Sequence, residues 1–146
     1  MRLVLLLFAF AAALLASTPR TLRVDYFHTG SATQEVFSLD RVVREPLPWP
    51  GPRDRGIDDT NLGKYAFEVA EAATGRLLYS RGFCSIYGEW ETTDEAKALT
   101  RTFSESLRFP EPGGPVKVTL KKRDAANAFK PIWTFTLDPS DPALDR

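Results

Sequence analysis

The chain has 146 residues, with 19 Lys and Arg against 19 Asp and Glu, so its formal net charge is zero. This length fits one domain of ordinary size rather than two. The balanced charge excludes a strongly basic nucleic-acid binder and an acidic solvating tail, and an aromatic content of 12% argues against disorder.

The first 16 residues have the pattern of a secretory signal peptide. Arg2 provides a short positive segment, an unbroken apolar run follows from Leu3 to Leu15, and small residues come directly after it. The run is shorter than the ~20 residues that a membrane-spanning helix needs. No cysteine follows it closely, which argues against a lipid anchor. We therefore expect a signal peptide at 1–16 and a secreted or periplasmic mature chain with no membrane attachment.

Apolar and polar residues then alternate with the two-residue period of half-buried strands. This pattern predicts seven strands, at Leu22–His28, Glu35–Glu45, Tyr65–Ala70, Arg76–Arg81, Phe103–Phe109, Val116–Lys121 and Ile132–Leu137. In the second of these the apolar residues change face, which predicts a β-bulge or two short strands. Gly75 lies between the third and fourth strands and predicts a tight hairpin connection.

One short helix is expected between the fourth and fifth strands. Thr92 and Glu95 have the spacing of a capping box, which predicts a helix over about Thr93–Thr102. The strands do not alternate with helices, so no parallel sheet is indicated. The predicted fold class is therefore mainly β, an antiparallel β-sandwich of about seven strands with one short helix.

The sequence has one cysteine and one histidine, which excludes several kinds of chemistry. Cys84 can form no intrachain disulfide and is expected to be a small buried hydrophobe. His28 is far from it in the sequence, so no catalytic dyad is indicated. The chain also lacks H-E-x-x-H, G-x-S-x-G and a phosphate-binding loop. We expect no catalytic residue, no metal and no cofactor.

Two loops have unusual composition. Residues 46–52 contain four prolines around Trp49, which predicts a stiff, extended connection. Trp49 either anchors a partner or folds back over the core. The acidic loop at 58–61 lacks the spacing of a calcium-binding loop, so Asp58 and Asp59 are more readily explained by turn formation.

Several longer motifs, taken together and in order, resemble one known family. They are E-P-L-P-W-P-G at 45–51, I-D-D-T-N-L-G-K-Y at 57–65, F-C-S-I-Y-G-E-W-E-T-T-D-E-A at 83–96, S-L-R-F-P at 106–110 and L-K-K-R-D at 120–124. The chain resembles the N-terminal domain of the IgA peptidase family of secreted bacterial zinc metalloendopeptidases, over about Leu22 to Asp138. The resemblance implies a β-sandwich that precedes a separate catalytic domain, which carries the zinc-binding H-E-x-x-H. No catalytic or metal residue carries over, and residues 139–146 resemble a tail or linker.

These observations predict an exported, non-catalytic module that binds protein, either a metalloendopeptidase catalytic domain or a protein substrate. Aromatic anchors ringed by polar residues are typical of binding hot spots. The interaction candidates are Trp49, Asp58, Asp59, Tyr87, Trp90 and Glu91. For Tyr87 and Trp90 the alternative is packing in the core.

Two other functions stay open. The chain is alternatively the N-terminal domain of a metalloendopeptidase whose catalytic domain is missing from it. It is alternatively a carbohydrate-binding module that stacks sugars on a coplanar, solvent-facing pair of aromatic side chains.

Overall fold

Seven strands and two short helices make up the fold. A computed structural model describes residues 18–144, so the predicted signal peptide at 1–16 lies outside the described residues. The elements follow in the order β1 (Arg20–Gly30), β2 (Glu35–Pro48), β3 (Tyr65–Glu71), β4 (Leu77–Phe83), α1 (Ile86–Trp90), α2 (Asp94–Ala98), β5 (Arg101–Pro110), β6 (Val116–Arg123) and β7 (Phe129–Leu137).

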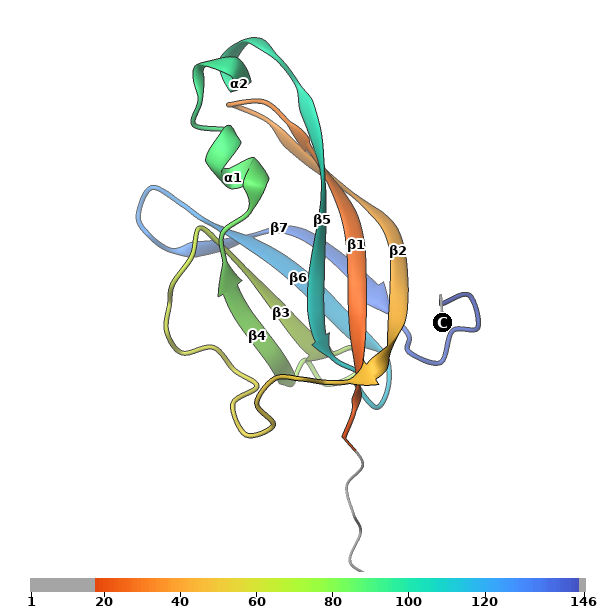
Figure 1. Cartoon of the computed structure of the whole chain (residues 1–146). Coiled ribbons are helices and arrows are strands. Elements are labelled where there is room, and N and C mark those ends of the chain that lie inside the picture. Colours follow the sequence, from red (N-terminus) through yellow and green to blue (C-terminus); the bar gives the residue numbers. More distant parts are fainter. Residues whose placement is uncertain (1–17, 145–146) are drawn as a thin grey trace, which may run out of the picture.

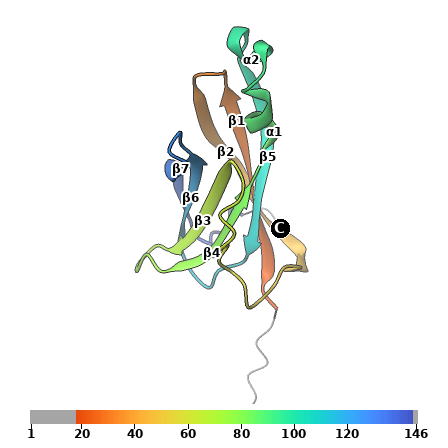
Figure 2. The same ribbon diagram turned by 90° about the vertical axis from the view of Figure 1, so that its left-hand side faces the viewer.

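The strands form two antiparallel sheets, which confirms the predicted fold class. The three-stranded sheet has the order β2-β1-β5, and the four-stranded sheet has the order β4-β3-β6-β7 (Figure 1). One end of the three-stranded sheet extends past the other sheet, and α1 and α2 lie beside this extension in both views (Figure 2). The connection from β4 to β5 therefore carries both helices across to the other sheet.

The core lies between the sheets and takes one face of each strand. On β1, Leu22, Val24 and Tyr26 are buried, while Arg23 and Asp25 alternate with them and form an ion pair on the outer face. The other strands and the proline-rich loop complete the core with Val42, Trp49, Phe67, Val69, Tyr79, Leu107, Phe109, Val116, Val118, Leu120 and Leu137. The alternation that predicted the strands is thus the alternation between core and surface.

A β-bulge interrupts β2, as the change of face in its sequence predicted. Asp25 pairs with Arg41, but the next residue, Tyr26, pairs with Leu39, so Asp40 is the extra residue. Beyond the bulge β2 continues as an edge strand and ends at Pro48. Proline is tolerated there because the outer side of an edge strand needs no ladder donor.

The helical prediction was wrong in three respects. The predicted helix over about Thr93–Thr102 is α2, which ends at Ala98, because Arg101 and Thr102 already pair with β1 as part of β5. Its N-cap is Thr93 rather than Thr92, and the Thr93 side chain accepts from the amide of Ala96. A second helix, α1, precedes it and is capped by the hydroxyl of Ser85, which accepts from the amide of Gly88 at 3.0 Å.

The expected burial of Cys84 was also wrong, because this residue is exposed. Cys84 lies between the end of β4 and the N-cap of α1. The half-buried ring of Phe83 packs against the core, and Ser85 is buried because its side chain caps the helix. The residue between them faces solvent.

The segment after β7 folds back onto the sandwich. Arg44 on β2 donates from Nη2 to the carbonyl oxygen of Pro139 at 2.6 Å, and Leu144 packs against the core. Residues 139–144 are the described part of the segment that was expected to be a tail or linker. Between residues 18 and 144 no helix has both the length and the apolar character needed to cross a membrane.

The β3–β4 hairpin allows a test of its turn. Gly75 has a φ of 74°, and a Cβ there would meet no atom within 4 Å, so only the backbone conformation opposes a side chain. We expect Gly75→Ala to lower the free energy of unfolding by about 1 kcal/mol. Gly113→Ala is the matched control, since Gly113 also has open space but no positive φ. Urea unfolding of both variants measures the difference, and equal stabilities would contradict the assignment.

Candidate functional site

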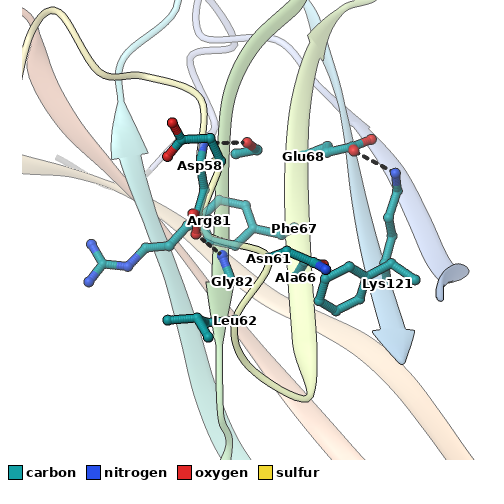
Figure 3. Close-up of a pocket in the computed structure, with 12 residues that line it drawn as sticks. Asp58, Asn61, Leu62, Ala66, Phe67, Glu68, Arg81, Gly82 and Lys121 are labelled. Carbon is teal, nitrogen blue, oxygen red and sulfur yellow. Dashed lines mark hydrogen bonds and ion pairs between the residues drawn. The ribbon is translucent and has the colours of Figure 1, made fainter. Parts of the chain in front are cut away.

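The loop at 57–62 lies against the edge of β4 and is held there by Asp58. The Asp58 carboxylate accepts from the amide of Gly82 at 2.7 Å (Figure 3). It also accepts from the amide of Thr60 at 2.9 Å. The backbone amide of Asp58 donates to the Ser80 hydroxyl at 2.9 Å, and the amide of Ser80 donates to the carbonyl of Gly56. The loop therefore occupies the outward-facing donors of an edge strand.

These hydrogen bonds explain the acidity of Asp58. The amide of Gly82, followed by the hydroxyl and amide of Thr60, stabilises the carboxylate and lowers its pKa below the ordinary value of 3.8. Asp58, predicted as an interaction candidate, thus has a defined role within the fold. Its neighbour Asp59 is different, since its side chain is 81% exposed and lies 3.4 Å from Arg55.

Arg123 holds the far end of the same loop. It donates from Nε to the carbonyl of Gly63 at 2.9 Å and from Nη2 to the carbonyl of Asn61 at 2.8 Å. Its guanidinium lies 4.0 Å from the ring centroid of Phe129. Asn61 has a φ of 51°, a left-handed conformation that asparagine tolerates. The loop is therefore fixed at both ends.

A shallow pocket of about 160 Å³ opens between this loop and the outer face of the four-stranded sheet. Ala66 and Gly82 contribute little or no side chain there, and Gly82 is required because a Cβ would lie 2.1 Å from the carbonyl oxygen of Leu62. The paired charges of Glu68 and Lys121, which are 2.5 Å apart, form part of the wall (Figure 3). The arrangement suits an apolar side chain surrounded by polar groups.

Apolar residues on the loop are left in solvent. Leu62 is 67% exposed and Ile57 is 45% exposed. We call Ile57, Asp59 and Leu62, with the pocket beside them, the loop surface. The sequence singled out the acidic residues of this loop, but it gave no signal that the apolar ones would be exposed.

Two of the predicted interaction candidates lie in the interior. Trp49 is 9% exposed, with its ring 5.6 Å from the ring of Tyr79 in an edge-to-face arrangement. Tyr87 is fully buried, and its hydroxyl oxygen lies 2.8 Å from the carbonyl oxygens of Ser31 and Gln34, which share its one proton. Neither ring is presented to solvent as an anchor. Both pack in the interior, which is the alternative that the sequence left open for each of them, and both fill space between segments that are distant in the sequence.

Trp90 and Glu91 are half-buried. The indole Nε1 of Trp90 donates to Glu95 at 2.7 Å, and its ring packs against Phe103. The Glu91 carboxylate is 2.5 Å from Lys64 and 2.8 Å from Lys122. Both candidates are therefore tied to their own fold more than they are presented to solvent.

A buried cluster of ionisable groups, which the sequence did not predict, surrounds His28. Its Nε2 lies 2.9 Å from Glu35, and its Nδ1 lies 3.2 Å from Glu105. Although burial opposes the charged ring, hydrogen bonds to the two carboxylates raise the pKa of His28 above 6.5. Burial raises the pKa of a carboxyl group, but the hydrogen bonds and charges of its partners, with His28 first among them, together outweigh it and keep the pKa of both Glu35 and Glu105 below 4.5.

This cluster joins both sheets and α1. Tyr26 donates to Glu105 at 2.8 Å, and the ring of Tyr87 stacks on His28 with centroids 3.7 Å apart. Lys122 on β6 donates to Glu35 at 2.8 Å. Every buried side-chain nitrogen or oxygen in the described part of the chain has a partner. The buried polar atoms of the cluster therefore bond to one another.

No metal site is indicated either. Within residues 18–144 no group of three or more histidine, cysteine, aspartate or glutamate side chains could hold an ion. The carboxylates nearest to His28 instead pair with its ring nitrogens and with Lys122.

Comparison with known proteins agrees with the resemblance that the motifs predicted. The family model described as peptidase M64 N-terminus matches residues 15–134, which is most of the chain. The family is an N-terminal domain, and no catalytic domain is evident. No curated protein matches the chain.

The role of Asp58 is testable with its neighbour as control. We expect Asp58→Ala to lower the free energy of unfolding by about 1–3 kcal/mol, because the amides of Gly82 and Thr60 lose their acceptor. Asp59→Ala should change it by less than about 0.5 kcal/mol. Urea denaturation measures both values, and amide exchange at Gly82 should accelerate only in the first variant. Equal effects of the two substitutions would refute the role.

The His28 cluster predicts a pH optimum of stability. The raised pKa of His28 stabilises the fold fully below 6.5, and this contribution is lost as the pH rises through the folded-state value. The lowered pKa values of Glu35 and Glu105 stabilise it fully above 4.5, and this contribution is lost as the pH falls. The contribution of the cluster is therefore largest between about 4.5 and 6.5.

The measurement is urea unfolding across this pH range together with NMR titration of the imidazole. His28 is the only histidine, so its ring resonances are unambiguous. A folded-state imidazole pKa below 6.5, or a free energy of unfolding that rises from pH 6.5 to 8.5, would contradict the assignment.

Proposed function

We infer that this chain, which belongs to the peptidase M64 N-terminal domain family, acts as an exported, non-catalytic module that binds protein. The partner we propose is either a metalloendopeptidase catalytic domain or a protein that such an enzyme cleaves. Export is supported by the signal-peptide pattern at 1–16.

The loop surface carries this proposal. Exposed Leu62 and Ile57 lie on a loop that Asp58 and Arg123 hold in one conformation. Binding to a preordered loop loses little conformational entropy, and a central apolar contact with a polar rim is the usual arrangement of a protein-binding hot spot. Asp59 adds a negative charge at this rim.

A non-catalytic role is supported by the state of the only imidazole. Both nitrogens of His28 are bonded to carboxylates and the ring is 1% exposed, so it is not available as a general base. Cys84 is exposed, but a nucleophilic thiol needs an accessible base partner.

The second candidate is that the domain belongs to a longer metalloendopeptidase, and it has the same support from the family match. Carbohydrate binding has less support. Phe27 is the one aromatic ring among the large side chains exposed in the described residues, at 38%, so no solvent-facing aromatic pair is available there for stacking a sugar.

Binding to a purified catalytic domain of a peptidase M64 enzyme, and to immunoglobulin A, tests the proposal by surface plasmon resonance. We expect Leu62→Asp to weaken the bound complex at least about tenfold, because it removes the central apolar contact. Val36→Asp is the matched control, with 64% exposure on the other sheet, and should leave the affinity unchanged. Absence of binding to both proteins, equal loss in both variants, or zinc-dependent cleavage by the mature chain would refute the proposal.

A further inference from the structure

The sandwich has four edge strands, and we propose that one of them, β5, binds an extended acidic segment of a partner protein as an additional strand. The site is the free edge of β5 from Ser104 to Arg108. This proposal rests on the proposed protein-binding function and names a chemistry for it. Edge strands present unpaired backbone groups that can pair with another chain.

The register of β5 shows which of its backbone groups are free. The amide of Glu111 donates to the carbonyl of Arg20 at 2.8 Å, so Arg20 and Glu111 are a hydrogen-bonded pair of the β1–β5 ladder. In an antiparallel pair the hydrogen-bonded positions alternate with the others. The amides and carbonyls of Ser104, Ser106 and Arg108 therefore point away from β1, and all three residues are exposed.

The edge of β4 is closed by the loop at 57–62. The outward amides of β4 are those of Ser80 and Gly82. The first donates to the carbonyl of Gly56, directly before the loop, and the second donates to the carboxylate of Asp58. Between residues 18 and 144 no loop bonds to the outward backbone groups of Ser104, Ser106 or Arg108, and β5 has no proline before Pro110.

The other two edge strands, β2 and β7, have features that oppose the addition of a strand. On β2 these are the bulge at Asp40 and the prolines 46 and 48. On β7 they are Pro131 and an irregular register beside it.

A cleft of about 370 Å³ lies beside the free edge, between β5 and β4. Its apolar lining comes from Trp49, Pro50, Phe67, Phe83 and Leu107. Pro50 is exposed, Phe83 is half-buried and the others are buried. A strand added to β5 would direct alternate side chains toward this cleft. The inward positions of the segment should therefore be bulky and apolar.

The charge at the rim selects an acidic partner. Arg108 and Arg81 line the cleft, and both are exposed. Arg81 forms no salt bridge with any described residue, while Arg108 uses its Nε for Glu45 at 2.8 Å. A second copy of this chain would place the arginines of two molecules together, which opposes self-pairing. Arg81 also lines the pocket of the loop surface, so the two regions are continuous.

The probe is a blocked nonapeptide of alternating glutamate and valine with a central phenylalanine, and its match has lysine at every glutamate position. NMR titration of the mature chain should show shifts of the Ser104, Ser106 and Arg108 amides with the acidic peptide. We expect its affinity to exceed that of the lysine peptide by about tenfold or more, because charges across the edge are complementary.

Two variants test the geometry and the charge separately. Ser106→Pro removes an outward donor that the fold does not use, and it should abolish binding while the thermal midpoint shows that the protein is folded. Arg108→Glu should remove the preference for the acidic peptide, because Arg81 and the new glutamate then balance each other, and Lys117→Glu on the outer face of β6 is its control. Should Ser106→Pro fail to fold, the charge reversal decides the proposal.

The proposal is overturned if the acidic peptide leaves the β5 amides unchanged, if both peptides bind equally, or if Ser106→Pro is folded and still binds. A concentration-dependent dimer that Ser106→Pro dissociates would overturn it in favour of a second copy. These outcomes are separate from the proposed function, because loss of partner binding in Leu62→Asp does not depend on β5.

Discussion

The buried ring of His28, bonded to Glu35 and Glu105, is the interaction on which the arrangement of the fold depends. An ionisable group inside a folded domain is tolerated only when its partners are all present and bonded. Those partners come from the β1–β2 hairpin and from β5, and Tyr87 of α1 stacks on the ring. Lys122 extends the same network to the four-stranded sheet. The contacts of one buried ring therefore join α1 to both sheets.

Asp58 has a different role, which is to hold a loop against the edge strand β4. A sandwich of two open sheets exposes four edges, and each needs a reason not to pair with other chains. The loop that Asp58 holds covers the edge of β4 with hydrogen bonds of its own. The same loop exposes Leu62 and Ile57 to solvent. The segment that covers the edge of β4 is therefore also the candidate binding surface.

Most of the fold could be predicted from local pattern. The two-residue alternation located the strands, and the change of face in β2 predicted the bulge at Asp40. The helix prediction extended too far because capping signals mark where a helix begins, whereas α2 ends where Arg101 starts to pair with β1. Burial of Cys84 was wrong for a related reason, since its neighbours take the inward positions.

The candidate site was less predictable than the fold. The motifs identified the family and the loop that matters, but they did not separate residues that bind outward from residues that hold the loop. Asp58 and Asp59 are adjacent and chemically identical, yet one is bonded to Gly82 and the other faces solvent. That difference depends on a strand more than twenty residues away.

By itself the sequence determined the strands, the family and the scarcity of catalytic side chains, because alternation and composition are local or additive properties. Only the tertiary structure decided that Trp49 and Tyr87 are interior, that His28 is enclosed between two carboxylates, and that β5 lies at the edge of its sheet. The physical reason is that burial and pairing are made by segments far apart in the chain. His28 and Glu105 are 77 positions apart, and no local pattern records that they meet.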